Sequence, residues 1–422
     1  MKHSSWLSSL LFPAVISLAV VSLAIIAQAK TIHVPVDQPT IQAGINAANN
    51  GDTVLVAPGT YFENINFMGK AITVKSSRGR KVTTIDGGNV ASVVTFSTGE
   101  GLSSVLRGFT IQHGNAVSND YDDGGGIFIN NASPTITGNT VTDNVAGHGG
   151  GGIAVLNYST AVVQGNIISN NSYSSFGYDT MGGAILINGG GGATQIIGNV
   201  IENNSWNSRT GGTGAIALDE AGTPTIENNI IRGNTVADGS STAISISDYS
   251  DALIVQNLIY NNTAPYGAPA IFFMVPEGRR GPLFVNNTIV AAGRYSGNSA
   301  VYADGFYDQV QFYNNLLIGA SGAPAVYCNA YSDPIPPTLT NNDGYSPGAP
   351  GFWGACSGQS GTNGNISADP LFVGKTNFRL RAKSPAINAG DNSAPDIPPE
   401  DLAGKPRIVD GAIDMGAYEY PD

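Results

Sequence analysis

The stretch TITGNTVTDN, residues 135–144, decides the fold, because six variants of it follow along the chain. Each copy has an apolar residue two or three places before a central asparagine and an apolar run after it. The central asparagines recur every 27 to 33 residues: Asn139, Asn166, Asn199, Asn229, Asn257, Asn287 and Asn315. A repeat of this length is typical of a solenoid, in which each unit buries its apolar side chains against its neighbours.

The unit around Asn139 divides into three short strands, at residues 127–129, 134–137 and 140–142. Strands this short do not fold alone, so each is expected to pair with its equivalent one coil away. The sequence therefore predicts an all-β fold, a parallel β-helix of about 10 coils that stack about 4.8 Å apart.

The asparagine corner has a structural interpretation. Asparagine tolerates the left-handed backbone of a tight corner, and its amide can bond to the asparagines of the coils above and below. We therefore expect a structural ladder rather than a ligand site. Phe109 stands at the equivalent place in the first regular unit, and we expect it to cap the ladder.

The two ends of the repeat region differ from its middle. Residues 38–48 are the one convincing helical stretch, with Ile41, Ile45 and Ala48 on one face, and predict a short helix over the open edge of the first coil. We assign residues 30–361 to the β-helix, with residues 30–60 as its N-terminal cap. The period is lost in residues 362–422, which we expect to close the C-terminal end.

Residues 1–29 predict a signal peptide: Lys2 is followed by an apolar run over residues 10–27 and by the small-x-small sequence of residues 27–29. Cleavage would leave Lys30 first, with no membrane span in the mature chain. An uncleaved anchor is the alternative, disfavoured because the run is short and contains Pro13.

The two cysteines, Cys328 and Cys356, are one repeat apart. In an oxidising compartment they could form a disulfide between neighbouring coils, and two unpaired thiols are the alternative.

The composition limits the partners. Only 12% of the 422 residues are charged, and the net charge is −12. An acidic balance argues against nucleic acid, whose phosphates require clustered cations. Neutral glycans and metal ions are compatible with it, whereas a polyuronate would need a local basic patch or bridging cations.

Three segments carry a family resemblance. The opening PTIQAGINAANNGDTVLVAPGTY and the GGGI…GN repeats resemble the pectin-lyase-like right-handed parallel β-helices. The tail ADPLF…SPAINAGD…DLAGKPR…DGAIDMGAYEY is similar to the choice-of-anchor Q domain of secreted bacterial proteins. The resemblance implies a right-handed helix in a secreted or extracytoplasmic bacterial protein.

Candidate functional residues gather in the loops between the third strand of one coil and the first strand of the next, which vary most in length. The ionisable residues there are Asp122, Asp123, His148, Asp179 and Arg209. The aromatic residues proposed as ligand contacts are Tyr121, Tyr178, Trp206 and Tyr266. Carboxylates, a cation and sugar-stacking rings on adjacent coils predict a polysaccharide site on the first-strand face. Asp, Asn and Gly are also ordinary corner residues, and corner chemistry is the alternative.

The resemblance also implies roles. In β-helix lyases, acidic side chains bind Ca²⁺ that bridges uronate carboxylates, so Asp122, Asp123 and Asp179 would be the Ca²⁺ ligands. Arg209 or His148 would transfer the proton. Hydrolases of the fold use paired aspartates instead.

No complete catalytic motif is present, so we favour a monomeric secreted protein that binds extracellular or cell-surface polysaccharide. A polysaccharide lyase, or less so a hydrolase, is the alternative. The tail aspartates could also hold Ca²⁺, although packing explains them more simply: Asp391, Asp396, Asp401, Asp410 and Asp414.

Overall fold

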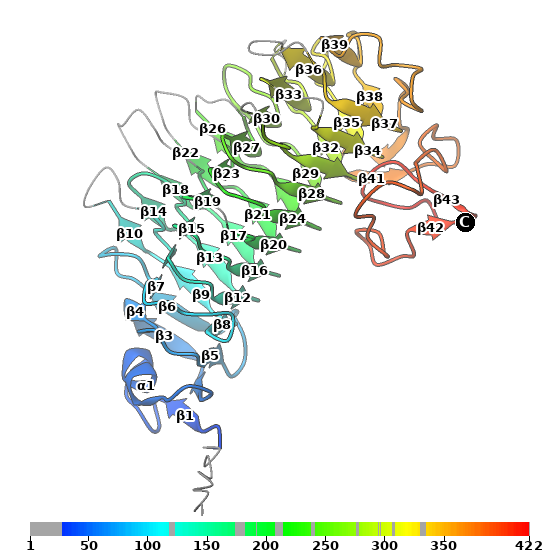
Figure 1. Cartoon of the computed structure of the whole chain (residues 1–422). Coiled ribbons are helices and arrows are strands. Elements are labelled where there is room, and N and C mark those ends of the chain that lie inside the picture. Colours follow the sequence, from blue (N-terminus) through cyan, green and yellow to red (C-terminus); the bar gives the residue numbers. More distant parts are fainter. Residues whose placement is uncertain are drawn as a thin grey trace, which may run out of the picture.

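The computed structural model describes residues 28–117, 123–173, 182–190, 192–206, 214–237, 241–275, 278–293, 295, 297–305, 309–329 and 335–421. Within these residues the chain winds into a long stack of coils, from the helix α1 (Ile41–Ala47) at one end to the last strands at the other (Figure 1). Three parallel sheets run along the stack, and a shorter fourth sheet accompanies its middle.

Each sheet takes one strand from each coil. Sheet A contains β1 (Thr31–Val34), β2 (Thr53–Val56), β5 (Thr73–Ser76), β8 (Val105–Arg107), β12 (Thr135–Thr137), β16 (Val162–Gln164), β20 (Gln195–Ile197), β24 (Thr225–Glu227), β28 (Leu253–Val255), β31 (Leu283–Val285), β34 (Gln311–Tyr313) and β37 (Thr338–Thr340). Sheet B contains β3 (Gly59–Phe62), β6 (Thr83–Asp86), β9 (Thr110–Gln112), β13 (Thr140–Thr142), β17 (Ile167–Ser169), β21 (Val200–Glu202), β25 (Ile230–Arg232), β29 (Leu258–Tyr260), β32 (Thr288–Val290), β35 (Leu316–Ile318) and β38 (Asp343–Tyr345).

Sheet C contains β4 (Ile65–Asn66), β7 (Val94–Phe96), β11 (Ile127–Asn130), β15 (Ile153–Leu156), β19 (Ile185–Asn188), β23 (Ile216–Asp219), β27 (Ile244–Ser247), β30 (Ile271–Met274), β33 (Val301–Asp304), β36 (Val326–Asn329) and β39 (Phe352–Gly354). Sheet D contains β10 (Asn115–Ala116), β14 (Val145–Ala146), β18 (Ser172–Tyr173), β22 (Ser205–Trp206) and β26 (Thr235–Val236).

The predicted parallel β-helix is confirmed. In the unit around Asn139, the three predicted strands are β11, β12 and β13, with bounds that agree within one residue. The two-residue strand β14 was not predicted. Strands pair in register with the next coil, as in Ile127 with Ile153, so equivalent side chains stack along the axis. Inward-facing Ile and Val fill a core that runs through the stack.

The seven predicted asparagines form the predicted ladder at the corner between sheets A and B, and all are buried. The amide Nδ2 of Asn166, for example, donates to Oδ1 of Asn199 at 3.0 Å and to the carbonyl of Ile136 at 3.0 Å. The ladder continues beyond the prediction to Asn342 and Asn365. At its start, the backbone N–H of Phe109 donates to Oδ1 of Asn139 at 3.0 Å, where the cap was expected.

One detail of this corner was wrong. The left-handed backbone belongs to the residue before each ladder asparagine, such as Gly138 with φ 65° or Asn228 with φ 58°. That residue turns the chain out of sheet A, and the asparagine that follows points its amide inward, beneath the backbone. The ladder therefore depends on a pair of residues rather than on one.

A second ladder, which the sequence analysis missed, lies between sheets B and D. It consists of Asn144, Asn171, Asn204, Asn234 and Asn262. Its amides bond to one another at 2.8 to 3.0 Å and are buried. The signal was visible, because each stands five residues after an asparagine of the first ladder.

The predicted helix over the first coil is confirmed but begins later than residue 38. Thr40 is the N-cap, and its Oγ1 accepts from the backbone N–H of Ala43 at 3.1 Å. The carboxylate of Glu63 accepts from the free N–H groups of Ile41 and Gln42 at 2.8 and 2.9 Å. Capping by side-chain oxygens fixes where a helix starts.

Residues 362–421 close the stack only at their beginning. Asn365 accepts from Asn342, and Ile366 forms a parallel bridge with Asp343. The chain then folds back along the outside of sheets A and B (Figure 1). It forms two antiparallel hairpins there: β40 (Phe372–Gly374) with β41 (Asn377–Leu380), and β42 (Ile408–Val409) with β43 (Ala412–Ile413).

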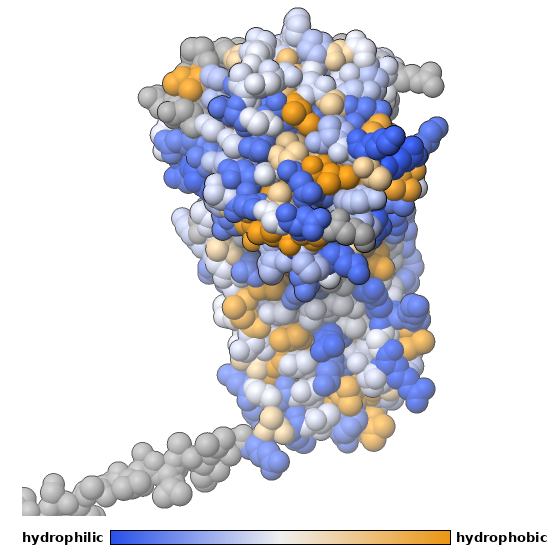
Figure 2. All heavy atoms as spheres, turned by 90° about the vertical axis from the view of Figure 1, so that its right-hand side faces the viewer, coloured by the Kyte–Doolittle hydropathy of each residue, from blue (hydrophilic) through white to orange (hydrophobic). Residues whose placement is uncertain are grey.

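This tail, residues 367–421, covers apolar side chains that point outward from the sheets. Phe378 packs on Leu258 and Tyr260, and Met415 packs near Leu316. Figure 2 looks at this side of the molecule, where the tail stands out from the surface of the stack. The resemblance of this region to the choice-of-anchor Q domain stays a prediction.

A buried ion pair joins two parts of the tail. Arg407 and Glu419 lie 3.2 Å apart and are almost fully buried. Burial raises the pKa of Glu419, while the Arg407 charge opposes that shift. Asp401 and Asp414 use their carboxylate oxygens for backbone N–H groups of the same region. For these two aspartates, packing therefore describes the contacts better than Ca²⁺ binding.

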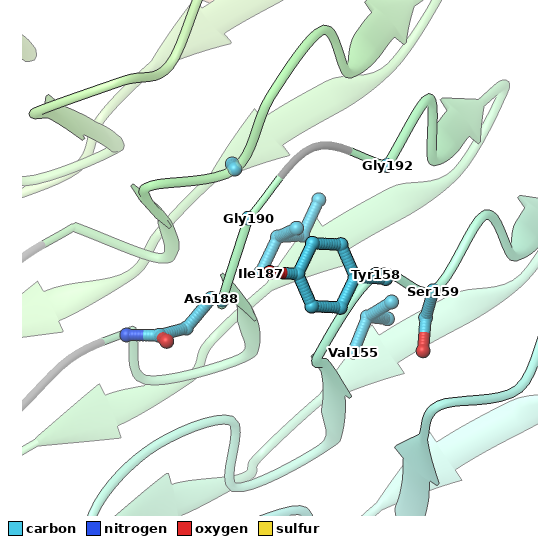
Figure 3. A pocket seen from close by; sticks show the side chains of 9 residues that line it. Val155, Tyr158, Ser159, Ile187, Asn188, Gly190 and Gly192 are labelled. Atoms are coloured by element: carbon cyan, nitrogen blue, oxygen red, sulfur yellow. The ribbon is translucent and has the colours of Figure 1, made fainter.

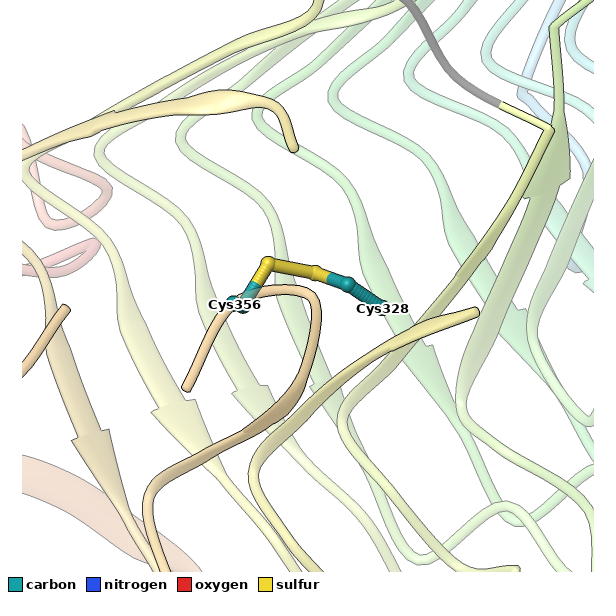
Figure 4. Close-up of a disulfide and its surroundings, with 2 residues drawn as sticks. All are labelled: Cys328 and Cys356. Atoms are coloured by element: carbon teal, nitrogen blue, oxygen red, sulfur yellow. A yellow bond between two sulfur atoms is a disulfide. The ribbon is translucent and has the colours of Figure 1, made fainter. Parts of the chain in front are cut away.

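The predicted disulfide is present between Cys328 in β36 and Cys356, which follows β39 (Figure 4). It connects the last two coils of sheet C, which pair directly.

Residues 1–27 lie outside the described residues, so the signal peptide stays a prediction. Across the described ranges, no helix is long and apolar enough to span a membrane.

Candidate functional site

The outer face of sheet C carries a row of aromatic rings in its last coils. Strand alternation points the second residue of each strand outward, and in β30, β33, β36 and β39 that residue is aromatic. We call these four residues the aromatic row: Phe272, Tyr302, Tyr327 and Trp353.

In-register pairing brings neighbouring rings of the row into contact. The centroids of Phe272 and Tyr302 are 5.7 Å apart, those of Tyr302 and Tyr327 are 4.9 Å apart, and both pairs are stacked. Trp353 ends the row with 51% of its surface exposed. Three stacked rings with polar edges, followed by an exposed indole, offer flat surfaces that suit the faces of sugar rings.

A shallow pocket of about 310 Å³ lies at the first end of this row. Its lining residues are Gly267, Ala268, Pro269, Phe272, Gly297, Tyr302 and Asp304. Tyr266, one of the predicted ligand residues, precedes Gly267 and is 77% exposed. The structure thus places Tyr266 next to the pocket, and its ligand role stays a prediction.

Polar side chains run beside the rings on the same face. Burial raises the pKa of Asp304, although the N–H of Gly305 and the amide of Asn329 oppose that shift. Asn329 Nδ2 donates to Asp304 Oδ1 at 3.3 Å. Burial also raises the pKa of Tyr302, and the nearby charge of Asp304 adds to it. Rings and hydrogen-bonding groups together are the usual lining of a ligand site.

A half-buried carboxylate lies further back on this face. Asp219 accepts from Asn188 at 2.8 Å and from Ser247 at 3.0 Å. Burial raises the pKa of Asp219 to about 6, with further contributions from Asp248 and Glu220. Among the described residues no group of three or more His, Cys, Asp or Glu is arranged to hold a metal ion.

Two of the predicted catalytic residues are brought together. His148 Nδ1 lies 3.0 Å from Asp123 Oδ1, across neighbouring coils, and both side chains are largely buried. An aspartate that fixes the orientation of a histidine is a common arrangement for proton transfer. The other residues predicted in this column lie outside the described residues: Tyr121, Asp122, Tyr178, Asp179 and Arg209.

The ligand role expected of Trp206 is contradicted. Trp206 belongs to β22 of sheet D, is 2% exposed and forms part of the core. Its ring lies against Gly183, where a Cβ would stand only 1.7 Å from ring carbon Cε3. No strand was predicted at this position, and the two-residue strand β22 turns this ring inward.

A second small pocket, near the corner between sheets C and A, is too small to hold a sugar (Figure 3). It measures about 10 Å³, and Val155, Tyr158 and Ile187 are among its lining residues. A space of this size holds at most one water molecule.

Sequence reasoning missed the aromatic row because it compared loops rather than first strands. The signal is present: IFFM, VYAD, VYCN and FWG each have an aromatic residue at the second position of the strand. Only the register between coils shows that these positions are neighbours on one face.

Comparisons with known proteins agree with this architecture. The family described as "Right handed beta helix region" matches residues 125–317. No curated protein sequence matches the chain.

Several solved structures are similar to it. Pectate lyase Pel9A is 16% identical with a TM-score of 0.46, over 90% of this chain and 91% of that one. XylC in complex with xylose is 12% identical with a TM-score of 0.48, over 78% and 83%. The A-module of the mannuronan C-5 epimerase AlgE6 from Azotobacter vinelandii is 16% identical with a TM-score of 0.45, over 78% and 94%. Together, the sheet topology and the matched family region show that the chain folds as a right-handed parallel β-helix.

Proposed function

We propose that this protein is secreted and binds an extracellular or cell-surface polysaccharide along the outer face of sheet C, without turning it over. The aromatic row is the observation that carries the proposal. Its rings stack at 5.7 and 4.9 Å and end at the exposed Trp353. A polymer laid along the stack axis would meet one ring per coil, with Asp304 and Asn329 available for its hydroxyls.

Binding by the row is tested with affinity electrophoresis of the full mature chain in gels that contain neutral or acidic polysaccharides. Trp353→Ala should weaken binding about tenfold, because loss of one stacked ring corresponds to about 1.4 kcal/mol. Phe62→Ala is the matched control, since Phe62 is 77% exposed but lies on sheet B. Equal mobility of Trp353→Ala and the unmodified protein on every retarding polysaccharide would overturn the proposal.

A lyase or hydrolase is the second candidate, and the contact between His148 and Asp123 favours it. In this candidate the predicted Ca²⁺ ligands are Asp123, which belongs to the pair, and Asp122 and Asp179, which lie outside the described residues. The test incubates the protein with a panel of uronates and Ca²⁺, and follows absorbance of unsaturated products and release of reducing ends. Product that disappears in His148→Ala would replace the non-catalytic proposal with this one.

A further inference from the structure

Five cations gather in the early coils of this acidic protein. Lys75 and Arg107 are direct partners in adjacent strands of sheet A and point outward, since Val74 and Leu106 beside them are buried. The loop after β5 adds three more. We call this cluster the basic corner: Lys75, Arg78, Arg80, Lys81 and Arg107.

The loop and the two strand residues form one patch. Gly79 lies against Gly108, the residue after Arg107, because a Cβ on Gly108 would stand 3.5 Å from the Gly79 Cα. Thr110 Oγ1 donates to the carbonyl of Arg80 at 2.8 Å and fixes the loop on the next coil. The basic corner thus occupies the same edge of the stack as the first asparagine ladder, ahead of the coils that the tail covers.

Arg80 holds the loop in place. Its Nη1 donates to the carbonyl of Asn139 at 3.3 Å and to that of Gly165 at 3.2 Å. Its guanidinium therefore reaches the second and third corners further along the stack and is partly satisfied by their backbone carbonyls. Of the other four cations, Lys75 is half-buried, and three are exposed: Arg78, Lys81 and Arg107.

Carboxylates of the described residues do not neutralise the patch. Within the described part of the chain, none of its five cations has a carboxylate oxygen within 4.0 Å. The nearby acids have other partners: Asp86 accepts from Gln112 at 2.9 Å and contacts His113 at 2.8 Å, and Glu100 is buried against Thr98. Like charges side by side in a sheet destabilise it, so an anionic partner would relieve the repulsion.

We propose that the basic corner binds a carboxylated polysaccharide directly, as a second contact site apart from the aromatic row. That the partner is a polysaccharide rests on the proposed function. A polyuronate carries one carboxylate on each sugar of a flexible chain, and the patch offers cations on successive coils about 4.8 Å apart. Arg78 and Arg107 can bind carboxylates through two parallel hydrogen bonds. In this proposal the cations of the patch contact the uronate carboxylates directly, so no bridging Ca²⁺ is needed.

A flexible single chain also suits the small size of the patch. A nucleic-acid duplex would bring many phosphates against the rest of a surface whose net charge is −12. A polyuronate can contact the basic corner over a few sugars, while the rest of its flexible chain stays away from the acidic surface around the patch.

The test measures binding of the full chain to polygalacturonate in EDTA at low salt. Arg78→Glu with Lys81→Glu should weaken binding at least tenfold. Lys375→Glu with Lys383→Glu is the matched control, because it changes the net charge by the same amount at exposed positions of the tail. The control should bind within about twofold of the unmodified protein, and binding should weaken as salt rises from 50 to 200 mM.

Three outcomes would overturn the proposal. The first is an equal loss in both double variants, which would mean that only net charge matters. The second is binding to polygalacturonate that EDTA abolishes. The third is tighter binding of duplex DNA than of polygalacturonate through the same two residues. Because Trp353→Ala removes a ring of the aromatic row and leaves all five cations of the basic corner in place, failure of the proposed function and failure of the basic corner give different results.

Discussion

At the scale of single residues, the ladder asparagines show how much one side chain can contribute. Asn229 Oδ1 accepts two bonds from Asn199, through its backbone N–H at 2.9 Å and its amide at 3.0 Å. Its own amide donates to Ile196 at 2.8 Å and to Asn257 at 3.0 Å. All of these groups are buried, and without the Asn229 side chain each would lose a hydrogen bond, which for the backbone N–H of Asn199 is the only bond it makes within the described part of the chain.

Asn229→Ala should therefore lower the free energy of unfolding by about 2 to 5 kcal/mol, since each buried group left unpaired costs about 1 to 3 kcal/mol. Urea unfolding followed by circular dichroism measures this. Asn46→Ala, at an exposed position of α1, is the control and should change stability little. If both variants unfold at the same urea concentration, the ladder is not a source of stability.

Asp343 is a buried carboxyl that makes stability depend on pH. Its Oδ1 accepts from Ala368 at 3.0 Å, while its buried Oδ2 has no partner in the described part of the chain. Burial raises its pKa to about 7, and the charge of Asp369 adds to this. The folded state thus binds the proton more tightly than the unfolded state, where the pKa is near 3.8.

The tighter proton binding by Asp343 adds at most about 4 kcal/mol to the free energy of unfolding. This stabilisation is complete below pH 4 and is lost as the pH rises through 7. Asp343→Asn should flatten the fall in unfolding free energy between pH 5 and 8. Asp369→Asn, at an exposed neighbour, should keep most of the slope. Parallel curves for Asp343→Asn and the unmodified protein would contradict this prediction.

At the scale of elements, the residue before a ladder asparagine differs, from Asn139 to Asn342, between the bare part of the corner and the part that the tail covers. In the bare part it is glycine, as at Gly138, Gly165 and Gly198. Under the tail it is an amide residue whose side chain bonds to tail carbonyls: Gln256 to Glu400, Asn286 to Asp414, Asn314 to Asp391 and Asn341 to Ala389. Asn228 stands between the two groups and accepts from Gln256 rather than from the tail. One corner position thus both turns the chain and docks the tail.

Asn314→Gly should loosen the tail while it leaves the coil intact, because glycine accepts the same left-handed backbone but loses both bonds to Asp391. Limited trypsin digestion should then cut faster after Arg381 and Lys383, with unchanged circular dichroism. Gly165→Asn makes the reverse exchange at an uncovered corner and should not change the cleavage rate. Equal cleavage of Asn314→Gly and the unmodified protein would exclude this docking role.

Sequence could predict the coils but not the tail, and the reason is distance along the chain. A period near 29 residues is repeated many times, so Asn139 and its equivalents are recognisable without structure. The contact between Gln256 and Glu400 spans 144 residues and occurs once. Likewise, Trp206 and Trp353 each stand second in a short strand. Only the structure shows that the ring in β22 faces inward and the ring in β39 faces outward.

At the scale of the whole molecule, the strands of sheet D and the tail lie on opposite sides of the stack (Figure 1). The aromatic row lies on sheet C, and the basic corner lies beside sheet A at the other end of the molecule. A long polymer could meet both surfaces. The disulfide lies at the end that carries the row, between Cys328 and Cys356.

Cys328→Ser with Cys356→Ser should destabilise the last coils locally, because the bond closes a segment of 28 residues, a constraint worth about 3 to 4 kcal/mol in the chain-entropy model. Coils of a solenoid contact only their neighbours, so early coils should be unaffected. Hydrogen exchange should therefore rise in β36 and β39 and not in β12. Faster exchange along the entire stack would instead indicate a single cooperative unit.

The direction of the ladder bonds has one more consequence. Between asparagines, each side-chain bond of both ladders runs from the amide of one to Oδ1 of the next one toward the C-terminus. Such a one-way chain tolerates the gain or loss of an entire coil, because the new neighbours offer the same donor and acceptor. It does not tolerate a partial coil. The length of this protein can therefore change only in steps of one coil.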